Sequence, residues 1–418
     1  MTSVAGESWF QDPALKRIMA LLNRDGGEGR VVGGAVRNSL MGLAVADIDI
    51  ATTLVPETVI ERAKGEGIKA VPTGIAHGTV TLVIDGKPFE ITTLRHDVAT
   101  YGRKADVAFG TDWQVDAERR DLTINALYAG SDGEVIDLVD GLADIETRTV
   151  RFIGNAAERI AEDYLRILRF FRFFAYYGSG RPDAEGLKAS AQARSKLKTL
   201  SAERIWSELK KILAAPDPGR ALLWMRQAGV LTEILPESEK WGIDAIAGLI
   251  SAERALGWPV APLLRLAAIV PPDAERLAAL AERLRLSNAD ARVLSDWAKA
   301  PAVADGVADT AFDRMLYQQG ATGYLIQLKL AVASNRARAE GDLEAMKRTG
   351  RLTALLARAE RWAKPVFPLN GADLLAAGFE PGRRVGEALS VLERQWLDSN
   401  FTLDRATLLA RIDQVKDG

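Results

Sequence analysis

Two different patterns of apolar and polar positions divide this chain. Between residues 30 and 140, short apolar runs alternate with turn-forming residues, which is typical of strands in a mixed α/β domain. Asp85 and Gly86 separate two of these runs and predict a β-hairpin, while residues 57–64 have the pattern of a helix. The runs that we expect to form strands are residues 30–32, 48–51, 79–84 and 89–93. The first third of the chain is therefore predicted to be a small mixed α/β head.

The pattern changes to helical spacing from about residue 155. Ile160, Tyr164, Ile167, Leu168 and Phe171 recur as they would along one face of a helix that continues through this segment. The rest of the chain is rich in Ala, Leu and Arg and gives no convincing strand after residue 153. We therefore predict an α+β fold in which the head is followed by helices only.

Composition adds few constraints. With 418 residues, 48% hydrophobic and 26% charged, the chain matches a globular protein of two to four domains. It contains no apolar run near the about 18–20 residues of a membrane span and no signal-peptide core, so no membrane association is expected. The absence of cysteine excludes disulfides and favours a cytoplasmic location. The formal net charge of −2 says nothing for or against a nucleic-acid partner, and no protein partner is indicated.

Carboxylates in the predicted strands give the first candidate chemistry. Asp47 and Asp49 lie in a short β-like run, where alternate residues face the same side about 6.6 Å apart. Such a pair can hold Mg²⁺, which prefers oxygen ligands, and Glu90 in another strand is a candidate third carboxylate. This arrangement suits in-line phosphoryl transfer, although Asp-x-Asp by itself more often marks a turn or a solvated edge.

The segment before the two aspartates strengthens this interpretation. Gly33 and Gly34 follow an apolar strand and lead into a predicted helix at residues 35–41, so backbone amides there can approach a triphosphate. Arg37 can supply a charged donor to the same anion. A pair of glycines alone is usually a tight turn, but the combination with Asp47 and Asp49 favours a nucleotide site.

A second polar cluster follows at residues 119–127. Asp121 and Asn125 are candidates for pairing with ribose hydroxyls, and Arg119 and Arg120 would face phosphate. The alternative is a helix N-terminus capped by Asp121 with solvated arginines.

Asp163 and Arg166 are three residues apart and would be neighbours on one helical face. Cytosine and adenine both present an exocyclic amine beside a ring-nitrogen acceptor, so a carboxylate and a guanidinium can pair with either base. Uracil and guanine present the reverse order and would leave both groups mismatched. The alternative is an intrahelical ion pair between Asp163 and Arg166.

The region around these residues is locally basic. Arg169 lies one helical turn beyond Arg166, and residues 144–211 carry 14 Lys and Arg against 9 Asp and Glu, which suits an RNA backbone.

With these residues the chain resembles the class II CCA-adding enzymes (tRNA nucleotidyltransferases), a family that also contains bacterial poly(A) polymerases. The family motifs occur in the expected order over residues 30–212. They are matched by Gly33, Gly34 and Arg37 with Asp47 and Asp49, by residues 119–127, by residues 137–141, by Glu162 and Asp163 with Arg166, and by residues 203–205 with Glu208.

The resemblance implies a four-part organisation. It comprises a nucleotidyltransferase head at 1–140, a helical neck for base selection at 141–215, a body at 216–300 and a tRNA-binding tail at 301–418. It further implies Mg²⁺ held by Asp47 and Asp49, and CTP and ATP recognised in one pocket by Asp163 and Arg166. Residues 95–109 correspond to the family's flexible loop, which accompanies the switch from C to A addition. The implied reaction adds C, C and A to the 3′ end of tRNA.

Two alternatives remain at this point. A poly(A) polymerase would use the same metal and ribose motifs, and a non-catalytic RNA-binding relative would keep only the fold. One departure from the family is Asn38, which stands where an aspartate is usual and can keep a hydrogen bond to Arg37 but not a charge. With two histidines in the chain, the metal phosphohydrolase domain of some relatives is not expected.

Overall fold

The computed structural model describes residues 2–101, 104–239, 241–338 and 342–416. The chain forms two compact units, Met1–Pro236 and Glu237–Gly418. Within the described ranges, no helix is both long enough and apolar enough to cross a membrane. The four-part organisation is finer than these two units and stays a prediction.

The head contains a seven-stranded sheet in the order β3-β4-β5-β2-β1-β8-β9. Its strands are β1 (Gly29–Val32), β2 (Asp49–Thr52), β3 (Lys69–Gly74), β4 (Thr79–Ile84), β5 (Lys87–Thr93), β8 (Leu127–Ala129) and β9 (Val135–Asp137). The β2–β5 pair is parallel and the other pairs are antiparallel. The predicted hairpin is confirmed: Asp85 and Gly86 connect β4 to β5 with positive φ at both positions, as a tight I′-type turn requires.

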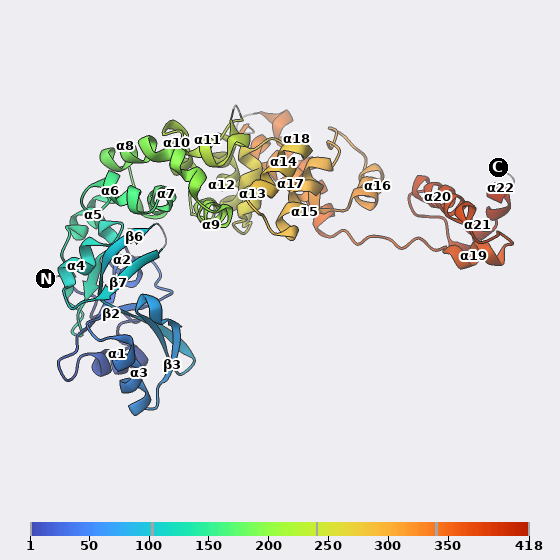
Figure 1. The fold of residues 1–418 in the computed structure, drawn as a ribbon. Coiled ribbons are helices and arrows are strands. Elements are labelled where there is room, and N and C mark those ends of the chain that lie inside the picture. Colours follow the sequence, from blue (N-terminus) through green and yellow to red (C-terminus); the bar gives the residue numbers. More distant parts are fainter. Residues whose placement is uncertain (1, 102–103, 240, 339–341, 417–418) are drawn as a thin grey trace. The chain divides into compact units, whose positions relative to one another are not determined.

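Helices cover the sheet and connect its strands. They are α1 (Pro13–Leu22), α2 (Gly34–Leu40), α3 (Pro56–Gly65), α4 (Trp113–Glu118) and α5 (Gly141–Thr147), with short 3₁₀ helices η1 (Ile75–His77) and η2 (Thr123–Asn125). In the blue part of Figure 1, α1 and α3 pack on one another and on the sheet. Asp12 caps α1 and Pro13 begins it, which explains its sharp start. The contacts of α2 with β1 and β8 fix the loop at Gly33 and Gly34 beside the centre of the sheet.

The segment expected to be the family's loop forms a two-stranded ribbon. Strands β6 (Arg95–Tyr101) and β7 (Lys104–Phe109) pair antiparallel, separately from the main sheet. Gly102 and Arg103 lie outside the described residues. The predicted link between this segment and the switch from C to A addition stays a prediction.

Helices complete the first unit: α6 (Ala156–Glu162), α7 (Leu165–Tyr177), α8 (Ala184–Ala193), η3 (Arg194–Thr199), α9 (Ala202–Leu213), α10 (Gly219–Gln227) and α11 (Val230–Ile234). The prediction of one helix through residue 163 is wrong, because Asp163 has an extended backbone and separates α6 from α7. Phe170, Phe171 and Phe174 of α7 are buried and form part of the core. Helix α7 packs on α9 and α10, which fixes its polar side relative to the head.

The second unit is entirely helical in the part that the structure describes. After η4 (Pro236–Ser238), its helices are α12 (Ala245–Leu256), α13 (Pro262–Ile269), α14 (Ala274–Arg283), α15 (Asn288–Lys299), α16 (Asp309–Gln319), α17 (Thr322–Arg338), α18 (Leu343–Glu360), α19 (Gly371–Ala376), α20 (Arg383–Asp398), α21 (Arg405–Leu409) and α22 (Ile412–Lys416). One core joins α16, α17 and α18, and a second joins Tyr317 of α16 to α19–α22. Across both units, the prediction that the described chain has no strand after residue 153 is confirmed.

Candidate nucleotide-binding site

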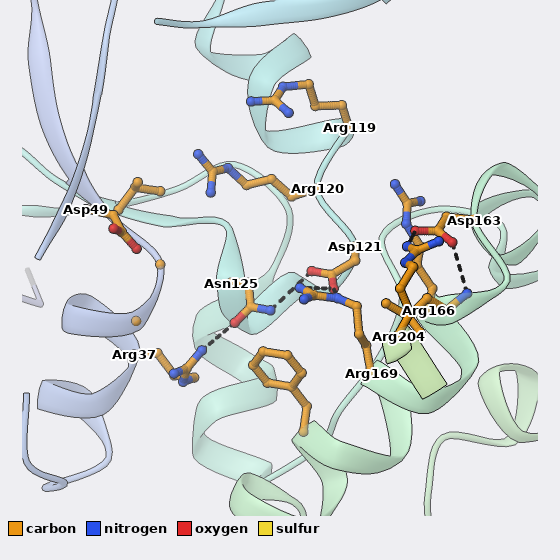
Figure 2. Close-up of a pocket in the computed structure, with 15 residues that line it drawn as sticks. Arg37, Asp49, Arg119, Arg120, Asp121, Asn125, Asp163, Arg166, Arg169 and Arg204 are labelled. Atoms are coloured by element: carbon orange, nitrogen blue, oxygen red, sulfur yellow. Dashed lines mark hydrogen bonds and ion pairs between the residues drawn. The ribbon is translucent and has the colours of Figure 1, made fainter. Parts of the chain in front are cut away.

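A cavity of about 550 Å³ opens in the first unit where the head sheet meets α7 and α9. The residues around it come from five places: the end of β1 with α2, the start of β2, the α4–η2 segment, the α6–α7 junction with α7, and α9 (Figure 2). They are Val32, Gly33, Gly34, Arg37, Asp49, Arg119, Arg120, Asp121, Asn125, Asp163, Leu165, Arg166, Arg169, Phe173 and Arg204. Most of the predicted site residues thus meet in one cavity, although they are spread from Gly33 to Arg169 in the sequence.

The carboxylates of the sheet lie at one side of this cavity. Asp49 begins β2 and lines the cavity, whereas Asp47 precedes the strand, so the prediction that both belong to one strand is wrong. Glu90 of β5 is the parallel-strand partner of Asp49, which puts both side chains on the same face of the sheet. In the described part of the chain, none of the three forms an ion pair or side-chain hydrogen bond. No group of three or more His, Cys, Asp or Glu residues there has metal-site geometry, so the role of Glu90 stays a prediction.

The electrostatics at Asp49 are those of a carboxylate crowded by like charges. Desolvation in the cleft raises its pKa, Glu90 and Asp47 raise it further, and Arg120 opposes them. Three carboxylates close together, with Arg120 acting on Asp49 but not in an ion pair with it, fit a hard divalent ion with oxygen ligands.

The glycine loop presents Arg37 at the opposite edge. Gly33 has φ +72°, a conformation that favours glycine, and its N–H donates to the Leu127 carbonyl and is therefore already used. Arg37 is only 6% exposed and donates to Asn38, Asn125 and the Tyr177 hydroxyl. It also lies over the Tyr177 ring at 4.1 Å, and burial lowers its pKa.

All of these hydrogen-bond partners of Arg37 are neutral, and Asn38 accepts through its amide oxygen. Arg37 is thus a buried guanidinium without a carboxylate partner among the described residues, an arrangement that suits an anionic ligand.

Arg119 and Arg120, which were predicted to face phosphate, are also bound within the protein. Both line the cavity, but each is already paired with the buried carboxylate of Asp116, which sequence reasoning had passed over. Arg120 also donates to the Tyr128 hydroxyl over 3.3 Å.

The predicted ribose residues are held by a chain of polar contacts. Asp121 is 8% exposed, accepts from Asn125 Nδ2 at 3.1 Å and pairs with Arg169 of α7 at 2.6 Å. Burial alone would raise its pKa, but the charge of Arg169 and the hydrogen bond from Asn125 hold the pKa of Asp121 below its usual range. Asn125 in turn accepts from Arg37, as Figure 2 shows. The helix-cap alternative is wrong, because Asp121 binds the neck rather than a helix N-terminus.

Asp163 and Arg166 line the far side of the cavity but do not pair with one another. The Asp163 carboxylate accepts from Leu165 N–H at 3.0 Å and from Arg204 of α9 at 2.6 Å. Arg166 Nη1 binds Glu162 at 2.5 Å and the Arg159 carbonyl at 3.1 Å. The intrahelical ion pair is therefore wrong, while the Arg166 Nε and Nη2 groups have no partner in the described residues.

Three further residues shape the site. In the sequence, Arg204 stands out only as part of the family motif at residues 203–205, and nothing in local spacing links it to Asp163, 41 positions away. Tyr177 and Asp116 likewise act on Arg37 and Arg120 through contacts made by folding. The sequence could have indicated these residues only by their chemistry, as polar residues on the buried side of an amphipathic helix.

Comparisons with known proteins agree with this site. Family models described as "Poly A polymerase head domain" and "Probable RNA and SrmB- binding site of polymerase A" match residues 29–151 and 182–241. The chain is 35% identical to a mitochondrial CCA tRNA nucleotidyltransferase 1 of Mus musculus, over 96% of this chain and 90% of that protein. It is 31% identical to the CCA-adding enzyme of Latilactobacillus sakei, over 94% and 95% of the two chains.

Solved structures show the same fold. The Bacillus stearothermophilus CCA-adding enzyme in complex with CTP superposes with a TM-score of 0.74 at 26% identity, over 96% of each chain. The Thermotoga maritima CCA-adding enzyme complexed with tRNA has a TM-score of 0.65 at 22% identity, over 96% of this chain and 95% of that one. As its motifs predicted, the chain belongs to the tRNA nucleotidyltransferase/poly(A) polymerase family, within the group of CCA-adding enzymes.

Proposed function

We propose that this protein adds C, C and A to the 3′ end of tRNA, using CTP and ATP and releasing pyrophosphate. The observation that carries the proposal is a charge imbalance at two places around one cavity. Among the described residues, Asp47, Asp49 and Glu90 form no ion pair with a cation, and the buried Arg37 forms none with a carboxylate. A metal–triphosphate complex supplies both missing charges, because it presents a cation and an anion together.

Divalent metal dependence is general in this family, and Mg²⁺ is our assignment for this chain. Asp47 and Asp49 would hold it, since both offer carboxylate oxygens free of protein partners in the described residues. Bound there, Mg²⁺ would supply Lewis-acid polarisation and stabilise the charge that develops on the leaving pyrophosphate. Glu90, beside Asp49, would add negative charge to the same place.

The other residues act by binding and orientation. Arg37 would donate to phosphate oxygens, and Arg120 would add a second guanidinium beside Asp49. Asp121 and Asn125 form the polar segment between them, where a ribose can lie. Orientation of the triphosphate and of the attacking 3′ hydroxyl is itself a large part of catalysis in phosphoryl transfer.

Base selection would belong to the far side of the cavity. The unused Nε and Nη2 of Arg166 can donate to the ring nitrogen of C or A, while the Asp163 carboxylate accepts from the exocyclic amine. Glu162 and Arg204 would hold this pair at a fixed separation. Uracil and guanine would oppose donor to donor and acceptor to acceptor, which costs buried hydrogen bonds.

The helical second unit would hold the tRNA. After Pro381 and Gly382, helix α20 begins at Arg383, whose side chain is 92% exposed. We propose residues 301–418 as a tRNA-binding tail that uses such arginines on backbone phosphate. A cytoplasmic location stays a prediction, because the mouse relative is mitochondrial.

A nucleotide-incorporation ladder tests the proposal. A tRNA that lacks its terminal three nucleotides, incubated with CTP and ATP, should be extended by three and then stop. Continued extension with ATP alone would identify a poly(A) polymerase, which the relatives matched over nearly the full chain do not favour. Asp47→Ala should abolish extension but leave tRNA binding intact. Wild-type protein that binds tRNA without extending it would be a non-catalytic relative.

A further inference from the structure

Asp116 is a buried carboxylate behind the cavity. It lies in α4, is 1% exposed and does not itself line the cavity. Its Oδ1 accepts from Nε and Nη2 of Arg119 at 2.8 and 2.5 Å. Its Oδ2 accepts from Nε and Nη2 of Arg120 at 3.2 and 3.0 Å and from the Tyr128 hydroxyl at 2.8 Å. One carboxylate thus fixes two guanidinium groups from behind.

In both arginines, part of the guanidinium group remains available to a ligand in the cavity. Their side chains remain 16% and 21% exposed, and their Nη1 groups have no partner in the described residues. Figure 2 shows Arg120 on the side of the cavity where Asp49 lies. Arg120 already acts electrostatically on Asp49, a carboxylate without an ion-pair partner in the described residues. Without Asp116 to hold it, the Arg120 side chain would be free to turn toward Asp49 and occupy the place of a metal ion.

From this geometry we propose that Asp116 is a positioning residue for the triphosphate. It holds Arg119 and Arg120 directed at phosphate oxygens and keeps Arg120 from pairing with Asp49. The inference rests on the proposed nucleotide transfer and adds a specific anchor behind it. If Asp116 served stability alone, its substitution would weaken the binding of CTP and of cytidine equally. If it positions arginines on phosphate, its substitution should weaken the binding of CTP more than that of cytidine, which has no phosphate.

The test is nucleotide binding without tRNA. Asp116→Asn keeps the size of the side chain but loses the charge. Arg119 and Arg120 bind different oxygens of Asp116, and the amide replaces one of these oxygens by an NH₂ group that cannot accept. The dissociation constant for CTP should rise about tenfold, equivalent to about 1.4 kcal/mol, while that for cytidine should change less than about twofold. In a separate assay with truncated tRNA as acceptor, the KM for CTP should rise more than kcat falls. Glu118→Gln, an exposed carboxylate on the same helix, should leave both constants unchanged.

A double-mutant cycle shows whether Asp116 acts through Arg120. In an Arg120→Met background, Asp116→Asn should weaken CTP binding by less than about threefold, because the group that it positions is already gone. Equal losses for CTP and cytidine, or full additivity with Arg120→Met, would overturn the proposal.

Folding must be separated from binding, because breaking a buried ion pair can destabilise a protein by about 3–5 kcal/mol. Binding is therefore measured well below the thermal midpoint of each variant. Asp116→Glu keeps the charge but moves it by one methylene, and should bind CTP more weakly than wild type and more tightly than Asp116→Asn. If Asp116→Asn does not fold and Asp116→Glu binds CTP as wild type does, Asp116 serves stability only and the proposal is wrong. Since no tRNA is present, a failure of the proposed tRNA extension would not affect this result.

Discussion

The carboxylates on the two sides of the cavity differ in their partners. At the β2–β5 edge, Asp49 and Glu90 have no ion-pair partner in the described chain, and burial together with nearby like charge raises the pKa of Asp49. On the other side, Asp116, Asp121 and Asp163 are each bound by arginine. An unpaired, partly desolvated charge is costly unless a ligand brings the opposite charge. The comparison therefore distinguishes carboxylates that we expect to bind a ligand cation from carboxylates that position other side chains.

The arginines divide in the same way. Five arginines have a carboxylate partner, whereas the hydrogen-bond partners of Arg37 among the described residues are all neutral. The five are Arg119, Arg120, Arg166, Arg169 and Arg204. Counting basic residues would treat these six alike. The pairing pattern instead indicates Arg37 as the group whose charge is least compensated by the protein.

The largest expected effect is at the unpaired carboxylates. Asp49→Asn should lower kcat for CMP incorporation by about 1,000-fold, since several kcal/mol of transition-state stabilisation would be lost with the metal. The matched control is Asp85→Asn in the β4–β5 turn, where asparagine tolerates the positive φ and activity should be unchanged. Activity of Asp49→Asn within tenfold of wild type would show that this edge does not hold the metal.

Removal of the uncompensated arginine should have the next largest effect. Arg37→Met should weaken CTP binding about 10- to 100-fold, because hydrogen bonds to a charged group contribute about 1.5–3 kcal/mol each. Isothermal titration with CTP and cytidine measures it, and the loss should be confined to CTP. Arg17→Met, a head arginine paired with Glu66 away from the cavity, is the control. A CTP affinity equal to that of wild type would contradict the distinction between paired and unpaired arginines.

A smaller effect is expected at the paired side, in selectivity rather than in rate. Arg166→Gln replaces a group that only donates by an amide that both donates and accepts, so the preference for CTP over UTP should fall about tenfold. Competition between labelled CTP and UTP on truncated tRNA measures this ratio. Arg181→Gln, an exposed arginine of the same unit outside the cavity, should leave the preference intact. The base-selection role is ruled out if Arg166→Gln also leaves it intact.

The smallest effect concerns stability in acid. Burial alone would raise the pKa of Asp116, but Arg120, Arg119 and Tyr128 hold it below the usual value of 3.8. A lowered folded-state pKa stabilises the protein above the unfolded-state value and loses that contribution as pH falls through the folded-state value. The difference in unfolding free energy between wild type and Asp116→Asn should thus be constant above about pH 5 and shrink below about pH 4. Urea unfolding at several pH values measures it. A difference that grows in acid would contradict the lowered pKa.

Local pattern was sufficient for a large part of the fold. Periodicity and turn chemistry depend only on residues that are close in sequence. They were enough to predict the β4–β5 hairpin, the helix at residues 57–64 and the helical character after residue 153. The errors lie at element ends. Asp47 falls outside β2, and Asp163 interrupts a helix that the apolar spacing continued, because its side chain binds Arg204 and the Leu165 N–H.

By itself the sequence determined which chemical groups the protein has, their order, and the apolar periodicity that puts Phe170 and Phe171 in the core. Only the tertiary structure decided which charges are neutralised within the protein. Asp121 meets Arg169 across 48 positions and Asp163 meets Arg204 across 41, while Asp49 forms no ion pair in the part of the chain that the structure describes. The physical reason is that ion-pair energies depend on a few ångströms and on local burial. Helix packing determines both the distances between charges and their burial, and the periodicity of the sequence gives no information about either.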